Sequence, residues 1–383
     1  MDRQTELALL DELIALREQQ GHYLDEASHQ NPATDYTDPK RFLAEQKAIF
    51  QRLPAPLVHT SELDGPNSFV QRTLAGRAVL VTRDKTGAVH AFLNVCRHRG
   101  ATLVTESSGC KARFTCPYHA WTYANTGELL SAPHFDAGFD DLEPSILGLR
   151  ALPFVERHGF IWVAIESSSP EQIVDYLAEI DGDLADLALD ESVIAAQTYQ
   201  SRQANWKILV EGGLEAYHFK VAHKNTIGPY FQNNLSSYQQ LGVHFRSILP
   251  RNALSDLADV TRDQWQLRNV ANILYSLFPN AHLLVQQDHV VWITQEPVSH
   301  NSTQLRLITL VPKNRFEETA YWQRNHAITE TTLNEDFDLG EDIQRGLDSG
   351  ATERVLFGRF EGALTRFNRQ VCAMLDKAGI TLE

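Results

Sequence analysis

Two short cysteine–histidine pairs constrain this chain more than any other feature. Cys96 and His98 lie in "CRHRG", and Cys116 and His119 follow in "CPYHAW", with seventeen residues between the two pairs. The chain has only four cysteines in 383 residues. An isolated free cysteine is usually a small buried hydrophobe, but two such pairs at this density are not expected by chance. The spacing predicts a metal centre, held by two turns that bring both pairs to one point.

Three interpretations of these pairs compete. The first is coincidence, in which the four side chains are unrelated core residues. The second is a structural zinc with two cysteines and two histidines, although zinc sites commonly pair Cys with Cys and His with His. The third is a [2Fe–2S] cluster in which one iron takes two Cys and the other takes two His. One Cys and one His on each loop favours the third.

The pattern C-x-H-x17-C-x-x-H closely resembles the signature of Rieske [2Fe–2S] domains. The resemblance implies that Cys96 and Cys116 hold one iron of the cluster, and that His98 and His119 hold the other. Neutral imidazoles in place of thiolates raise the reduction potential of such a cluster. Trp121 is a candidate for shielding the cluster from water, with ordinary core packing as an equal alternative.

Composition limits the kind of partner. The formal net charge is -15, which argues against nucleic acid and anionic membranes, because both require a basic surface. The N-terminus lacks the features of a signal peptide, and no apolar run is long enough to cross a bilayer. We therefore expect a cytoplasmic protein with no membrane or nucleic-acid partner. Cys110 and Cys372 are interpreted as packing residues.

The texture of the sequence predicts three regions. Residues 1–45 are expected to form a helical N-terminal segment that packs on the catalytic domain. Residues 46–165 contain short β-rich runs separated by glycine turns and are expected to form the cluster domain. Residues 166–383 mix helices and strands: paired strands are expected at 282–299 and 303–313, and helix from 316 onward.

A second constellation lies in "NWKILVEGGLEAYHFKVAHKNT", residues 205–226. Glu215 and His218 are three residues apart, so they would share a face of a helix. His218 and His223 are five apart and would diverge by about 140° on a regular helix, so they meet at one metal only if the helix ends or bulges between them. The alternative is that they are two unrelated histidines on a polar helix.

Two histidines need a carboxylate to complete a 2-His-1-carboxylate triad for iron(II). The segment "NEDFDLGEDIQRGL" offers five candidates, and spacing alone does not choose among them. They are Glu335, Asp336, Asp338, Glu341 and Asp342.

The order N-W-K, then (D/E)-x-x-H-x4-H, then a late acidic segment resembles the catalytic domain of Rieske non-haem iron oxygenase α subunits. The resemblance covers residue 40 to the C-terminus. It implies that His218, His223 and Asp336 bind a mononuclear Fe(II), and that Glu215 is the carboxylate that bridges electron transfer between subunits. Many relatives have Asp at 215 and Asn at 212, where this chain has Gly212.

The resemblance implies an α+β fold, with an N-terminal Rieske antiparallel β domain placed before a helix-grip (START-like) catalytic domain. It also implies a terminal oxygenase that uses O2, with electrons from NAD(P)H through a separate reductase or ferredoxin, and a homotrimer (α3). The reaction would be hydroxylation, dihydroxylation or demethylation of a small organic, aromatic substrate. A quaternary ammonium or N- or O-methyl substrate is the alternative, and a zinc-stabilised binding protein is the non-enzyme alternative.

The substrate cavity is expected to draw its lining from residues 210–300. Six aromatic side chains are candidates, with at least half of them expected to be plain core. They are Phe219, Phe231, Phe245, Tyr275, Phe278 and Trp292.

Overall fold

The computed structural model describes residues 1–166 and 169–380 and divides into two compact units. One unit comprises residues 50–176. The other combines residues 1–49 with the chain from Leu177 onward. The N-terminal segment therefore belongs to the same unit as the C-terminal half. Among the described residues, no helix is long and apolar enough to cross a membrane.

The unit of residues 50–176 is built from short antiparallel strands. Its elements are β2 (Ala55–His59), β3 (Ser68–Leu74), β4 (Arg77–Arg83), β5 (Val89–Leu93), β6 (Ser108–Cys110), β7 (Arg113–Thr115), β8 (Thr122–Ala124), β9 (Leu129–Ser131), α4 (Phe135–Gly138), β10 (Phe154–Arg157), β11 (Phe160–Val163) and most of α5 (Pro170–Leu177). The sheets run β10–β11–β2, β5–β4–β3–β6 and β7–β8–β9.

Turn chemistry explains the hairpin between β4 and β5. The side chain of Asp84 accepts from the backbone N–H of Thr86 at 2.7 Å, and Gly87 has φ +91°. Aspartate commonly caps its own turn in this way, and glycine adopts positive φ without steric cost. The Asp-Lys-Thr-Gly turn expected from the sequence is therefore present.

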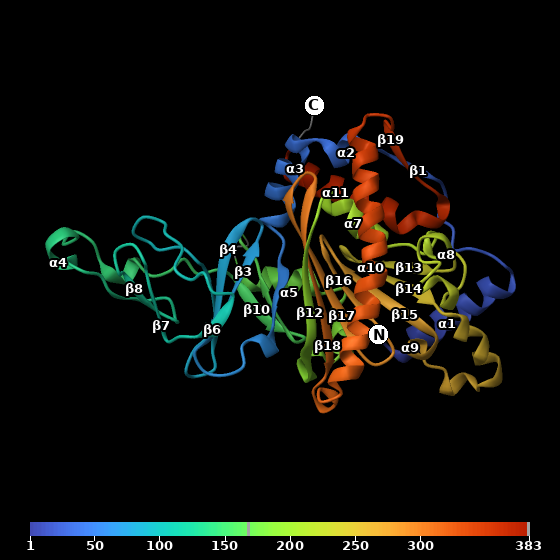
Figure 1. Ribbon diagram of the computed structural model, residues 1–383, viewed down its shortest axis with the longest axis horizontal. Coiled ribbons are helices and arrows are strands. Elements are labelled where there is room, and N and C mark those ends of the chain that lie inside the picture. Colours follow the sequence, from blue (N-terminus) through green and yellow to red (C-terminus); the bar gives the residue numbers. More distant parts are fainter. Residues whose placement is uncertain (167–168, 381–383) are drawn as a thin grey trace. The chain divides into compact units, whose positions relative to one another are not determined.

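The larger unit contains a seven-stranded antiparallel sheet (Figure 1). Its strands are β12 (Ser192–Arg202), β13 (Ser237–Leu241), β14 (His244–Pro250), β15 (Ala271–Leu277), β16 (Ala281–Val285), β17 (Val290–Ser299) and β18 (Ser302–Pro312). They lie in the order β12–β18–β17–β16–β15–β14–β13. Every residue of β14 is buried, as expected for a strand that is covered on both faces.

Helices and one small sheet complete this unit. They are α1 (Arg3–Glu18), β1 (His29–Pro32), α2 (Thr34–Thr37), α3 (Pro39–Glu45), α6 (Asp181–Ala185), α7 (Trp206–Gly212), α8 (Phe219–Ala222), α9 (Leu267–Val270), α10 (Thr319–Asp348), β19 (Arg354–Phe357) and α11 (Gly362–Lys377). The 30-residue α10 lies along the sheet and contacts β12, β18 and α7 (Figure 1). The expected α+β, helix-grip fold is confirmed.

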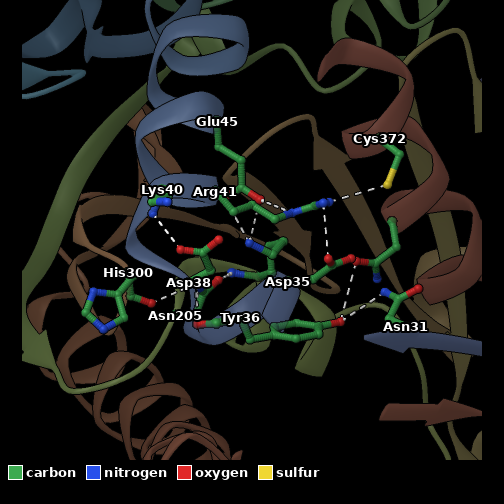
Figure 2. Close-up of polar contacts among 12 residues, drawn as sticks. Asn31, Asp35, Tyr36, Asp38, Lys40, Arg41, Glu45, Asn205, His300 and Cys372 are labelled. Carbon is green, nitrogen blue, oxygen red and sulfur yellow. Dashed lines mark hydrogen bonds and ion pairs between the residues drawn. The ribbon is translucent and has the colours of Figure 1, made fainter. Parts of the chain in front are cut away.

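The N-terminal segment is tied to the rest of its unit by a polar cluster. Figure 2 shows Arg41 between Asp35, at 3.1 Å, and Glu45, at 3.3 Å. Glu45 is buried and also receives the Lys207 ammonium, whose Nζ lies 2.7 Å from Oε1. The indole N–H of Trp206 donates to the other oxygen of Glu45 at 2.9 Å. Helix α3 therefore fixes the first turn of α7.

We expect Lys207→Met to destabilise this unit by about 3 kcal/mol, because it leaves the buried Glu45 carboxylate with only part of its charge compensation. Urea unfolding followed by circular dichroism measures the change. Lys40→Met, at an exposed lysine of α3, is the matched control and should change stability by less than about 0.5 kcal/mol. Equal unfolding midpoints for the two variants would contradict the assigned role of the pair.

Candidate metal centres

The two Cys–His pairs lie on loops with the same backbone hydrogen bonds. The N–H of Cys96 donates to the carbonyl five residues ahead at 2.8 Å, and its carbonyl accepts from the N–H four residues ahead at 3.0 Å. Cys116 makes the same two bonds, at 2.8 and 3.0 Å. Each cysteine therefore starts a tight loop of the same kind, with the histidine two residues later in the first loop and three residues later in the second.

The side chains of the two loops meet. The rings of His98 and His119 have centroids 4.6 Å apart, and burial together with the neighbouring Cys116 thiol raises the pKa of the Cys96 thiol. Both thiols are buried. The Nδ1 atoms of both histidines are buried and have no hydrogen-bond partner among the described residues. Two thiol sulfurs and two unpartnered imidazole nitrogens are the donor set of a Rieske cluster, so these residues fit that group.

Aromatic side chains surround this donor set. Trp121 is buried and stacks on His98, with centroids 4.9 Å apart and planes at 9°. The Tyr123 hydroxyl lies 3.4 Å from the sulfur of Cys96. A hydrogen bond to a cluster sulfur is one means by which a protein sets the reduction potential. The interpretation of Cys110 as a packing residue is wrong, because this thiol is exposed at the end of β6.

Ala120 in the second loop has a left-handed backbone conformation, which is unfavourable for a residue with a side chain. Gly100, at the end of the first loop, has φ +81°, and Ala120 holds the equivalent place in the second loop with φ +56°. A side chain in this left-handed region costs roughly 1 kcal/mol relative to glycine. Ala120 therefore carries a small backbone strain, which the surrounding loop maintains.

The second candidate centre lies where the helix expected over residues 206–223 is broken. Helix α7 ends at Gly212, and α8 comprises one turn that ends at Ala222. Glu215 lies in the link between them, so the expectation that it shares a helix face with His218 is wrong. The end of α8 satisfies the condition for both histidines to meet, because it lies between them. His223 follows that end directly and has φ -99°.

His218, His223 and Asp336 converge, and one donor atom from each lies within 4.8 Å of the other two. Oδ1 of Asp336 lies 3.3 Å from Nε2 of His218 and 2.9 Å from Nε2 of His223. Asp336 comes from α10. Two imidazoles and one carboxylate are the donor set of a 2-His-1-carboxylate iron site, and these residues fit such an ion.

Each histidine is held from its outer nitrogen by a further carboxylate. Nδ1 of His218 is paired with Glu215, and Nδ1 of His223 lies 2.8 Å from Oε2 of Glu335. Thr226 donates to the same Glu335 oxygen. Such carboxylates fix the tautomer and the orientation of metal-binding imidazoles. The sequence offered Glu335 only as one possible ligand, next to Asp336, and its contact with His223 was missed.

The charges within the site are strongly coupled. Burial lowers the pKa of His218, but the neighbouring Asp336 and Glu215 outweigh it and raise that pKa to about 10. Burial also raises the pKa of Asp336, and the two imidazoles outweigh it and leave that pKa lowered. Without a metal the chain therefore balances the carboxylates with protonated imidazole, and a bound cation would replace that proton.

An apolar cavity of about 120 Å³ opens beside this site, between α7, α8, the sheet and α10. His223 and Asp336 form part of its wall. Of the six aromatic candidates, Phe219 and Phe231 line the cavity; the other four are core residues outside its lining. The expected limit of residue 300 is wrong, because α10 contributes side chains from Ile328 to Phe337.

A second cavity, of about 240 Å³, is bordered by His218 and Asp336. Its wall includes the carboxyl groups of Glu211, Glu215 and Glu361. Gly212 borders both cavities, and a Cβ there would meet nothing within 4 Å. The missing side chain at 212, where many relatives have Asn, therefore leaves open space next to the candidate iron site.

Comparison with known families supports both centres. Residues 54–152 match the Rieske [2Fe-2S] domain, and residues 189–377 match the catalytic domain of the ring hydroxylating alpha subunit. The chain belongs to the Rieske oxygenase α-subunit family. A Rieske cluster and a mononuclear iron are therefore its cofactors.

Relatives of known function include mono- and dioxygenases. The oxygenase subunit of glycine betaine monooxygenase from Chromohalobacter salexigens is 28% identical over 94% of this chain and 89% of its own length. The large subunit of anthranilate 1,2-dioxygenase from Acinetobacter baylyi is 30% identical, over 64% of this chain and 53% of its own length. The chain is thus a terminal oxygenase component, an oxidoreductase.

Solved structures share the fold. A quaternary ammonium Rieske monooxygenase superposes with a TM-score of 0.76 at 24% identity, covering 90% of this chain and 94% of the other. Naphthalene 1,2-dioxygenase from Rhodococcus sp. superposes with a TM-score of 0.75 at 20% identity, covering 97% and 98%. Rieske oxygenases of this family work with a reductase or ferredoxin and form multimers.

The Glu335 contact predicts a loss of metal affinity. Glu335→Gln should weaken the binding of Fe(II) to metal-stripped Rieske oxygenase by about 10- to 100-fold, because the imidazole of His223 loses the carboxylate that orients it. Competition with a chelator measures the affinity. Asp342→Asn, at an exposed carboxylate farther along α10, is the control. Identical affinities for both variants would mean that Glu335 does not position His223.

The buried Glu211 carboxyl should make the free energy of unfolding depend on pH. Burial raises the pKa of this carboxyl to about 7, from a reference of 4.5. The folded chain thus holds a proton that the unfolded chain loses, and stability falls as pH rises from about 5 to 8. Glu211→Gln keeps the oxygen that accepts from Tyr36 and Asn368, both at 2.7 Å, and removes the titration.

We therefore expect the melting temperature of Glu211→Gln, relative to the unmodified chain, to rise between pH 5 and 8. The difference corresponds to a few kcal/mol at most. Glu353→Gln, at an exposed carboxylate of the same unit, controls for the loss of one negative charge. A constant difference in melting temperature across this range would contradict the assignment.

Proposed function

We propose that this oxygenase binds its cluster through Cys96, His98, Cys116 and His119. The observation that supports this assignment is the pair of equivalent loops, whose two thiols and two unpartnered imidazole nitrogens meet. The two cysteines must stay reduced until they bind iron, and the cytoplasm suits that requirement. Electrons would come from NAD(P)H through a separate reductase or ferredoxin.

The mononuclear iron would be held by His218, His223 and Asp336. The convergence of their donor atoms within 4.8 Å, beside an apolar cavity, is the observation that carries the proposal. When bound, the iron supplies the activation of O2. The side chains then have separate tasks: Glu215 and Glu335 fix the two imidazoles, and the apolar wall excludes water from the reacting substrate.

We assign Glu215 a second task, as the bridge for electron transfer from a neighbouring subunit. Its carboxylate holds Nδ1 of His218 and borders the second cavity, and it is not part of the described lining of the apolar cavity. A homotrimer with a head-to-tail arrangement would bring a cluster histidine of one subunit to this carboxylate in the next.

The substrate is a small organic molecule that is hydroxylated, dihydroxylated or demethylated in the apolar cavity. An aromatic substrate fits the apolar lining. A quaternary ammonium substrate is the second candidate, because the relative that spans 94% of this chain is the oxygenase subunit of a glycine betaine monooxygenase. Exposure of the chemically reduced protein to O2 with each candidate in turn, followed by product analysis, separates the two.

Metal analysis of anaerobically purified protein tests the assignment of ligands. We expect about three irons and two acid-labile sulfides per chain, with the visible colour of a Rieske cluster. His223→Ala should fall to about two irons and keep both sulfide and colour, because it removes one ligand of the mononuclear site only. His300→Ala, a partly exposed histidine of the same unit, should keep all three. Zinc with neither sulfide nor colour would instead indicate a zinc-stabilised binding protein.

A further inference from the structure

Two side chains that line the apolar cavity each have a buried polar atom with no hydrogen-bond partner among the described residues. They are Nε2 of His282 and Oε1 of Gln295, and each residue is 2% exposed. Both residues line the cavity. An unpartnered buried polar atom is rare in a folded protein and calls for a partner. In this cavity the available partner is a bound molecule.

The rest of each side chain is fixed. Nδ1 of His282 lies 2.9 Å from the hydroxyl of Ser276, and the amide nitrogen of Gln295 donates to the carbonyl of Leu209 at 3.2 Å. His282 on β16 pairs with Ile293 on β17. Gln295 is two residues beyond Ile293, so His282 and Gln295 are diagonal neighbours on one face of the sheet. Two fixed polar side chains therefore lie next to each other in the wall of the cavity.

Apart from the candidate iron site, the cavity wall offers no fixed positive charge. None of the described lining residues is a lysine or arginine. His282 is no substitute, because burial lowers its pKa to about 4 and it is neutral near pH 7. A carboxylate bound at His282 and Gln295 would lose its hydration without gaining a counter-charge from a neighbouring side chain. The charge content of the wall therefore disfavours anionic substrates.

A quaternary ammonium head also fits poorly. It carries neither a donor nor an acceptor for hydrogen bonds, so it would leave His282 and Gln295 unpartnered. The aromatic rings of the cavity wall are Phe219, Phe231 and Phe337, and the Arg202 guanidinium already lies over the Phe337 ring at 5.5 Å. A hydroxyl group, in contrast, donates and accepts at once. It would satisfy the Gln295 oxygen and the Nε2–H tautomer of His282.

We propose that His282 and Gln295 form a polar anchor that selects an uncharged, otherwise apolar substrate with one hydroxyl group. This inference rests on the proposed function, since it describes the substrate of the same iron site. The cavity of about 120 Å³ is comparable with the roughly 150 Å³ cavity that holds benzene in another protein, so a molecule of about one ring is the expected size.

Calorimetry with the iron-loaded holoprotein tests the anchor under argon and without reductase, so that no turnover occurs. Four probes share one ring and differ in the attached group: toluene, benzyl alcohol, benzoate and benzyltrimethylammonium. Benzyl alcohol should bind roughly tenfold more tightly than toluene, because it gains hydrogen bonds to two preorganised partners. Benzoate and benzyltrimethylammonium should bind more weakly than toluene.

Substitutions test whether His282 and Gln295 cause the preference for benzyl alcohol over toluene. His282→Leu and Gln295→Leu should each remove most of the advantage of benzyl alcohol over toluene while toluene still binds. Ile293→Val is the matched control: it removes one methylene from the same face of the sheet and should affect the two probes equally. The comparison of probes on the unmodified protein needs no variant, so a failure of either variant to fold leaves the test intact.

Three outcomes would overturn the anchor. They are tight binding of benzoate or benzyltrimethylammonium, an alcohol preference that survives both substitutions, and no binding of any probe. Iron and sulfide are measured on the same samples. Full metal content without the alcohol preference would refute the anchor alone, whereas missing iron or sulfide would refute the proposed function.

Discussion

The buried ion pair between Glu45 and Lys207 is the constraint on which the rest of the larger unit depends. A charge in the protein interior is tolerated only with a close partner and further hydrogen bonds. Glu45 has both, because Lys207, Trp206 and Arg41 all contact its carboxylate. The pair therefore specifies one docking position for α3 on α7. Since α7 leads directly into the link that carries Glu215, an error in this docking would displace the metal site.

The candidate iron site combines packed helices with an interruption between α7 and α8. A continuous helix would direct His218 and His223 to different sides, so the chain ends α7 early and uses a single turn, α8, between the two histidines. Helix α10 then supplies adjacent residues with different tasks. Asp336 faces both Nε2 atoms, and Glu335 holds the outer nitrogen of His223. One turn of a packed helix thus contributes both a ligand and the group that orients another ligand.

The sequence predicted some of these features and not others, for physical reasons. The sequence was enough to propose the cluster residues, because both Cys–His pairs are local and their spacing is distinctive. The pairing of Asp336 with histidines more than a hundred residues earlier depends on how α10 packs, so only the family resemblance distinguished it from its acidic neighbours. The contact of Glu335 with His223 was missed, and so were His282 and Gln295. Their roles depend on the facing of a helix and the register of strands, which composition does not reveal.

Iron binding and substrate choice depend on different elements of the fold, so a relative can share the first without the second. The candidate iron ligands come from the α7–α8 link, the residue after α8, and α10, and the family match of residues 189–377 includes them all. The polar atoms of the cavity come from β16 and β17, where a single substitution changes hydrogen bonding without disturbing the fold. A wall without lysine or arginine among its described residues offers no cationic side chain for a carboxylate-bearing substrate such as glycine betaine. Shared oxygen chemistry is therefore compatible with a different substrate, because the two depend on different side chains.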